Sequence, residues 1–143
     1  MQRKDFLKKA CRICLLGTGV SSVIDLAGCS PAVANNLLKP EVIDNKIQVP
    51  LHIFDKDPQQ IISPKKYPFE IAVEKKSDNT FRALLLKCTH QENQLTPTGN
   101  GFTCSVHGSR FDKEGSVLTG PAEYSLQQLK TIIIQNNLFI QLK

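Results

Sequence analysis

The sequence predicts an all-β fold, a sandwich or barrel built from about eight short strands. Short runs rich in apolar residues recur from residue 47 to the end of the chain, and turn-forming residues separate them. The clearest pair lies at the end of the chain, where 131–135 and 138–142 flank Asn136 and Asn137. Both asparagines tolerate the positive φ that a two-residue hairpin turn requires. This pattern of strands and turns favours antiparallel sheets.

The other expected strands follow in order along the chain, each bounded by turn-forming residues. They lie at 47–54, 69–73, 80–86, 102–104 and 116–118. The turn segments between them include 76–79, 99–101 and 112–115. The run at 80–86 leads directly into Lys87 and Cys88. The stretch Ala122–Leu129 is the candidate helix, although its helix propensity is weak.

Four potential metal ligands form two clamps. Cys88 and His90 make a Cys-x-His pair, and Cys104 and His107 make a Cys-x-x-His pair, with 13 residues between the clamps. Beyond residue 30, the remaining histidine, His52, has no motif around it and is expected to be an ordinary surface or strand residue. Two thiolates and two imidazoles suit a 2Fe–2S cluster in which histidines hold one iron. A structural zinc site is the alternative, although zinc motifs usually begin with paired cysteines.

The sequence around both clamps resembles the Rieske 2Fe–2S family. Three stretches carry the resemblance, namely Lys87–His90, Cys104–Asp112 and Thr119–Ala122. They are similar to the two cluster-binding loops and to the proline loop of that family. The resemblance implies an antiparallel β-sandwich with a small inserted cluster-binding subdomain and one 2Fe–2S cluster per chain. It also implies that Cys88 and Cys104 hold the inner iron, and that His90 and His107 hold the outer iron near the surface.

Four further positions bear on the reduction potential and on how the loops are held. Ser109 stands where the family's serine donates a hydrogen bond to a cluster sulfur, and Phe111 stands where a tyrosine often donates one. Such donors stabilise the reduced cluster and raise its potential. Because this chain keeps only one of the two donors, we expect its reduction potential to lie between the extremes of the Rieske range of about −150 to +300 mV. Asn93 and Val106 replace the cysteines of the disulfide found in the respiratory branch, so that bridge is absent.

Residues 1–28 are predicted to be an export signal. Five basic residues lie within the first twelve, and an apolar run follows at 13–27. The stretch Arg3–Lys8 resembles a twin-arginine motif with lysine in place of the second arginine, and the Sec route stays open. The stretch Leu26–Cys29 resembles a bacterial lipobox, which implies cleavage before Cys29 and a lipid on its thiol. An ordinary buried cysteine is the alternative interpretation of Cys29.

The rest of the chain divides into a tether at 29–44 and a single domain at 45–143. Asp25 argues against a lasting transmembrane anchor, because a carboxylate in an apolar span is costly. The chain has 18 basic and 13 acidic residues, a net charge of +5. Without 1–28, thirteen basic and eleven acidic residues remain, a net charge of +2. The basicity therefore comes mostly from the signal and does not indicate nucleic-acid binding.

Three functional classes fit these features. The favoured one is a lipid-anchored, extracytoplasmic electron-transfer protein, or a subunit of a redox complex, whose protein partner docks at His90 and His107. The second is a soluble Rieske ferredoxin that supplies an oxygenase, and the third is a zinc-binding structural domain. An oxygenase catalytic subunit is excluded, because it would need two further histidines and a carboxylate for a second iron site, and only His52 remains. We therefore expect an electron carrier without a substrate site of its own.

Overall fold

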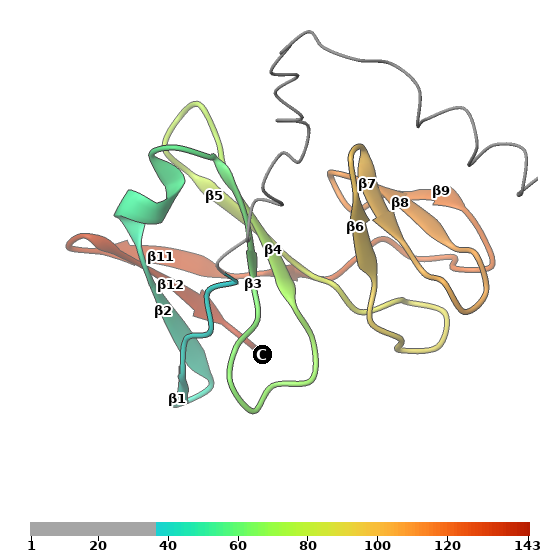
Figure 1. Ribbon diagram of the computed structural model, residues 1–143, viewed down its shortest axis with the longest axis horizontal. Coiled ribbons are helices and arrows are strands. Elements are labelled where there is room, and N and C mark those ends of the chain that lie inside the picture. The colour runs from blue at the N-terminus through green and yellow to red at the C-terminus, as the bar shows by residue number, and fades with distance from the viewer. Residues whose placement is uncertain (1–36) are drawn as a thin grey trace, which may run out of the picture. The chain divides into compact units, whose positions relative to one another are not determined.

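Twelve short β-strands and one 3₁₀ helix make up the fold in this computed structural model, which describes residues 37–143 (Figure 1). The elements are β1 (Val42–Ile43), β2 (Lys46–Pro50), η1 (Leu51–Phe54), β3 (Gln59–Ile62), β4 (Ile71–Lys75), β5 (Phe81–Leu85), β6 (Thr96–Thr98), β7 (Gly101–Thr103), β8 (Arg110–Asp112), β9 (Val117–Thr119), β10 (Gln128–Leu129), β11 (Thr131–Ile134) and β12 (Asn137–Gln141). They form three antiparallel sheets, β1-β2-β12-β11, β10-β5-β4-β3 and β6-β7-β8-β9. The prediction of an all-β fold is confirmed.

The N-terminal predictions fall on residues that the structure does not describe. The export signal at 1–28, the lipid site at Cys29 and the first half of the tether at 29–44 lie outside the described residues. Strand β1 falls within the last residues of that tether segment. Among the described residues, no helix is long and apolar enough to cross a membrane.

The first two sheets enclose the main hydrophobic core. Along β2 and β12, buried and less buried residues alternate, as expected for sheets with one face in the core. The core contains Ile47, Val49, Ile62, Ile71, Val73, Ala83, Leu85, Leu138 and Ile140, among others. Burying one isoleucine or leucine side chain contributes about 1.5–3 kcal/mol. This core makes the two sheets a β-sandwich, as the sequence predicts.

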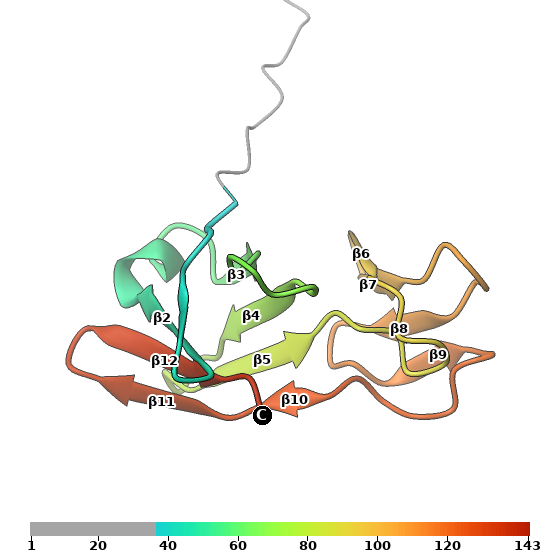
Figure 2. The same cartoon turned by 90° about the horizontal axis from the view of Figure 1, so that it is seen from below.

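Strand β5 connects the sandwich to a second, smaller core. Its residues Ala83 and Leu85 belong to the main core, whereas Leu84 and the following Leu86 belong to the second one. The chain leaves the sandwich after β5, forms the β6–β9 sheet, and returns as β10, which pairs with β5 (Figure 2). The second core contains Leu84, Leu86, Cys88, Leu95, Phe102, Cys104, Phe111, Ala122 and Leu126. The β6–β9 sheet and its loops are therefore an inserted subdomain, and both candidate cysteine ligands lie in its core.

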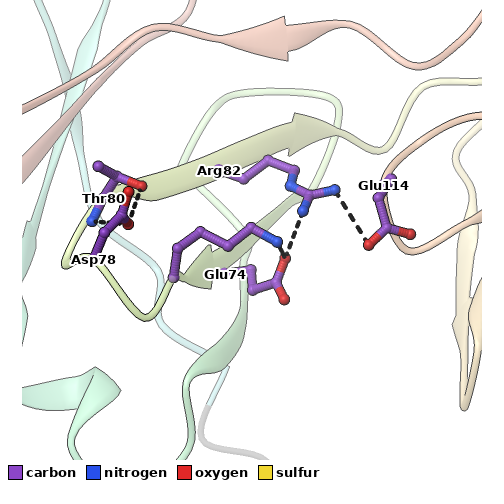
Figure 3. A network of polar contacts seen from close by, with 6 residues as sticks. Glu74, Asp78, Thr80, Arg82 and Glu114 are labelled. Atoms are coloured by element: carbon purple, nitrogen blue, oxygen red, sulfur yellow. Dashed lines mark hydrogen bonds and ion pairs between the residues drawn. The ribbon is translucent and has the colours of Figure 1, made fainter.

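Charged side chains join the sandwich to this subdomain (Figure 3). The Arg82 guanidinium of β5 lies 3.3 Å from Glu74 of β4 and 3.6 Å from Glu114, which is in the turn between β8 and β9. Lys76 Nζ lies 2.7 Å from the same Glu74 oxygen. That oxygen is buried and has no well-aligned hydrogen-bond donor, so its attraction to the two cations is mainly Coulombic. Because Arg82 is only 15% exposed, the network helps to hold the subdomain on the sandwich.

Two predicted elements are wrong. The strand expected at 47–54 ends at Pro50, and the chain continues as the 3₁₀ helix η1. The candidate helix Ala122–Leu129 is not helical. Its backbone pairs with distant segments instead, because Leu126 N–H donates to the Gly115 carbonyl and the Gln127 carbonyl accepts from Leu85 N–H. Only its last two residues form regular structure, as β10.

The final hairpin is present, but its turn is shifted by one residue. The turn consists of Gln135 and Asn136, with φ of 53° at Gln135, and β12 begins at Asn137 opposite Ile134. The sequence suggested Asn136 and Asn137, because asparagine tolerates positive φ better than glutamine does. The sequence also missed β1, β3, β6, β8 and β10, so the prediction of about eight strands is too low.

Candidate iron–sulfur site

The first clamp lies on a tight loop that follows β5. Cys88 N–H donates to the Asn93 carbonyl at 2.8 Å, and Glu92 N–H donates to the Cys88 carbonyl at 2.8 Å. Glu92 adopts a φ of 55°, in the left-handed region, which lets the chain turn back. The loop therefore holds Cys88 at its base and leaves His90 near its turn.

The second clamp repeats this pattern between β7 and β8. Cys104 N–H donates to the Ser109 carbonyl at 2.8 Å, and Gly108 N–H donates to the Cys104 carbonyl at 2.9 Å. Gly108 has a φ of 79° and occupies the same loop position as Glu92 in the first clamp. The two loops are thus closed by equivalent hydrogen bonds, although the histidine comes two residues after the first cysteine and three after the second.

The four side chains form two pairs that differ in burial. Cys88 is 1% exposed and Cys104 is fully buried, and both lie in the second core. His90 and His107 are both exposed, with ring centroids 5.0 Å apart and an interplanar angle of 84°. The sequence-predicted residues are therefore brought together, with the sulfurs inside and the imidazoles outside. His52 lies apart from them, exposed on η1.

Local hydrogen bonds favour the thiolate form of Cys104. Burial raises the pKa of this thiol, but the backbone N–H groups of Val106 and His107 and the Cys88 thiol lower it by more. The net result is a pKa below the ordinary value for cysteine. Backbone donors directed at a buried sulfur would also stabilise a metal-bound thiolate.

A third segment, residues 120–124, is tied to both loops. Ser109 is fully buried, and its hydroxyl oxygen accepts a hydrogen bond from Ala122 N–H at 3.0 Å. This contact leaves the hydroxyl proton of Ser109 free for another acceptor. From the first loop, the Thr89 hydroxyl donates to the Tyr124 carbonyl at 2.6 Å. The contact between Thr89 and Tyr124 was not predicted, because no sequence signal links residues 35 positions apart.

These two contacts connect both loops to the segment 120–124 without a disulfide. Among the described residues, Cys88 and Cys104 are the cysteines, and both are free. Asn93 supplies a backbone carbonyl instead, which accepts from Cys88 N–H. The loops are therefore held by hydrogen bonds within each loop and through the segment 120–124.

Removing the Thr89 hydroxyl is expected to loosen the first loop. In Thr89→Val, loss of this hydrogen bond should lower the stability of the closed loop by about 1 kcal/mol. An iron chelator should then bleach the visible absorbance of the cluster faster than in the parent protein. Thr89→Ser keeps the hydroxyl and is the matched control, which should lose absorbance more slowly than the valine variant. Equal rates for the two variants would show that the contact with Tyr124 has no stabilising role.

The chemistry of the donor set suits an iron–sulfur cluster. Two cysteine thiols and two imidazoles are the side chains that would hold a 2Fe–2S cluster in which histidines replace two cysteines. The thiols are buried and the imidazoles are exposed, and the buried Ser109 hydroxyl follows the second clamp with its proton free.

Comparison with curated proteins identifies relatives with the same kind of domain. The chain is 35% identical over 69 residues to cytochrome b6-f complex iron–sulfur subunit 3 of Nostoc sp. PCC 7120, covering 46% of this chain and 39% of the relative. It is 36% identical over 55 residues to subunit 1 of Synechocystis sp. PCC 6803, covering 37% and 31%. The matched parts thus span less than half of the length of these relatives.

Solved structures share the fold. A plasma membrane Rieske protein from Synechocystis PCC 6803 aligns with a TM-score of 0.51 and 23% identity, covering 64% of this chain and 94% of that protein. A naphthalene 1,2-dioxygenase aligns with a TM-score of 0.52 and 18% identity, covering 76% of this chain and 27% of the enzyme. Such identities indicate a common fold alone.

The match to a family model covers the site and most of the domain. The Rieske [2Fe-2S] domain model matches residues 41–130, well over half of the chain, including both clamps and the segment 120–124. The chain therefore belongs to the Rieske [2Fe-2S] domain family and binds one 2Fe–2S cluster.

Proposed function

We propose that this chain transfers single electrons through a 2Fe–2S cluster held by Cys88, His90, Cys104 and His107, as a membrane-tethered protein or redox-complex subunit outside the cytoplasm. The bound cluster takes up and releases one electron at a time. The observation that carries the ligand assignment is the equivalent hydrogen bonding of the two loops, which bury the cysteine pair and expose the histidine pair.

The burial of each pair suits a different task. Cys88 and Cys104 bind as thiolates, because a metal-bound cysteine must be deprotonated, and the lowered pKa of Cys104 favours that form. The surrounding apolar core keeps water from the sulfurs. His90 and His107 face solvent, so they give the electron a short path to a partner. Their free ring nitrogens can also exchange protons with water or with that partner.

We further propose that a protein partner docks at the His90/His107 tip. Exposed apolar side chains accompany the two rings in the cluster-binding subdomain, with Val106 56% exposed and Tyr124 70% exposed. The curated relatives are named as subunits of a cytochrome b6-f complex, which supports a membrane redox complex as the setting. The chain itself needs no substrate site for this role.

The reduction potential tests the assigned role of Ser109. Its hydroxyl proton is available to a cluster sulfur, because the oxygen accepts the bond from Ala122 N–H. Ser109→Ala should lower the potential by up to about 100 mV, the scale of one hydrogen bond to a charged group. Phe111→Tyr should raise it, because the new hydroxyl would restore the donor that this chain lacks. A redox titration of the parent chain at either extreme of the Rieske range would contradict the intermediate value.

The proposed location depends on the N-terminal sequence. Residues 1–28 would direct export, and a lipid on Cys29 would hold the domain at the outer face of a bacterial membrane. Expression of Cys29→Ala in a bacterial host should release the cluster-loaded domain from the membrane fraction, while its visible spectrum stays unchanged. Membrane binding that survives this substitution and a salt wash would contradict the lipid anchor without affecting the ligand assignment.

A further inference from the structure

The outer face of the β1-β2-β12-β11 sheet carries exposed apolar side chains among polar ones such as Gln48 and Gln141, where solvent-facing positions of a sandwich are usually polar. Register places Ile132 directly opposite Phe139, and Ile134 follows on the same side of β11. Ile43 on β1 lies across β2 at the other edge of the sheet. The three isoleucines are 61%, 52% and 67% exposed, respectively. We call Ile43, Ile132, Ile134 and Phe139 the apolar face.

Two hollows lie on either side of Phe139 within the apolar face. One, of about 450 Å³, is lined by Pro40, Ile43, Lys46 and Phe139 among others. The other, of about 150 Å³, lies against Lys46, Lys130, Ile132, Ile134, Phe139 and Gln141. Lys46 and Phe139 line both hollows, so the two hollows adjoin, and Gln48 and Asn137 also line the larger one. Large exposed apolar side chains gathered on one face in this way often mark an interaction site.

The chain N-terminal to the sheet reaches the domain beside this face. Pro40 and Glu41 line the larger hollow, and Pro40 is eleven residues after Cys29. Eleven residues span at most about 40 Å even when fully extended. If Cys29 carries the proposed lipid, the hollow therefore stays within about 40 Å of the bilayer. The apolar face then meets the membrane surface repeatedly, because the tethered domain cannot diffuse away.

The charges around the apolar face suit an anionic bilayer. Lys46 and Lys130 line the smaller hollow and are exposed. Of the two carboxylates beside the larger hollow, Glu41 is paired with Lys65 at 3.2 Å, which leaves Asp44 as the opposing charge. Apolar side chains flanked by lysines are typical of surfaces that rest at the interface of anionic membranes.

We propose that the apolar face docks on an anionic phospholipid bilayer; this inference rests on the proposed lipid anchor at Cys29. Figures 1 and 2 both show the β1-β2-β12-β11 sheet and the β6–β9 sheet at opposite ends of the described domain. Docking through the first sheet therefore leaves the His90/His107 tip accessible to its redox partner. The lipid holds the domain near the bilayer, and the apolar face and the two lysines then favour the docked orientation.

The absence of tryptophan from the chain allows a direct test. Ile132→Trp places a single reporter on the apolar face, and Leu118→Trp on β9 is the matched control, because both parent side chains are apolar and 61% exposed. Each mature, cluster-loaded variant is reconstituted into vesicles of phosphatidylglycerol and phosphatidylethanolamine. Emission in brominated lipid is compared with emission in unbrominated lipid, so that quenching by the cluster cancels. Flotation of the vesicles reports the anchor separately.

We expect both variants to float, and only the Ile132→Trp reporter to be quenched by brominated lipid. Adding Lys46→Gln or Lys130→Gln to that variant should lower the ratio of docked to undocked domain about fivefold for each lysine. Equal quenching of both reporters, or of neither, in floating vesicles would overturn the inference and leave the anchor intact. Failure to float would overturn the anchor and the inference together. If the Ile132→Trp side chain were already buried against a second copy of the protein in the absence of lipid, the inference would also be overturned.

Discussion

Replacing His107 with alanine is expected to abolish the 2Fe–2S cluster. His107 and His90 form the exposed pair, and neither of their two loops holds another histidine that can substitute. Loss of one imidazole leaves an iron with an incomplete ligand set, so the purified variant should contain little iron and lack the visible absorbance of the cluster. Iron analysis together with the absorbance spectrum measures this effect.

His52→Ala is the matched control for this substitution. His52 is also an exposed histidine, but it lies on η1 in the sandwich. It should therefore retain two irons per chain and an unchanged spectrum. If His107→Ala kept a full cluster, the ligand assignment would be wrong. If His52→Ala also lost the cluster, the loss in both variants would reflect misfolding of the domain and not the removal of a ligand.

Gly101→Ala is expected to cause the largest loss of stability. Gly101 begins β7, the strand that leads to Cys104, and has a φ of 153°. A Cβ there would overlap the Phe111 carbonyl oxygen and lie 3.0 Å from the Asp112 backbone. Because a paired backbone cannot move aside cheaply, the free energy of unfolding should fall by about 3 kcal/mol or more. Thermal unfolding of the cluster-loaded protein would measure the change.

Gly99→Ala supplies a control two residues away in the same turn. A Cβ at Gly99 would have no atom within 4 Å, so this substitution should change the stability by no more than about 0.5 kcal/mol. Equal stability of the two variants would show that the close approach of β7 to β8 is not rigid. The comparison also separates steric conflict from the general loss of glycine flexibility.

Much of the site was predictable because ligand chemistry is visible in residue types and spacing. Cys88, His90, Cys104 and His107 stand out by their pattern, and the structure brings them together as two pairs. Gly108 also gives a local signal, since glycine favours the left-handed φ found there. Glu92 occupies the equivalent position without any such signal, so the similarity of the two loops emerges only in three dimensions.

Contacts between distant segments were not predictable. The Thr89 hydroxyl meets the Tyr124 carbonyl, and this partner is decided by the path of 120–124 over the site. The same holds for Ala122–Leu129, whose backbone pairs with Gly115 and Leu85 and so overrides any helical preference. Strands of two or three residues, such as β1 and β6, are too short to show an alternating pattern.

The apolar face was also hidden in the sequence. The run from Ile132 to Ile134 reads as a buried strand, because continuous apolar residues are typical of strands covered on both sides. In the structure, β11 is the edge of its sheet, and all three isoleucines are largely exposed. Sequence alone does not reveal this exposure, so the proposed docking surface could not be recognised without the structure.

The most direct test of the account is an electron paramagnetic resonance spectrum of the mature protein, recorded before and after reduction with dithionite. Iron and zinc are assayed on the same sample. The account predicts a silent oxidised state, a rhombic signal with a mean g below the free-electron value on reduction, and two irons per chain. A colourless protein that stays silent after reduction and carries one zinc ion would contradict it.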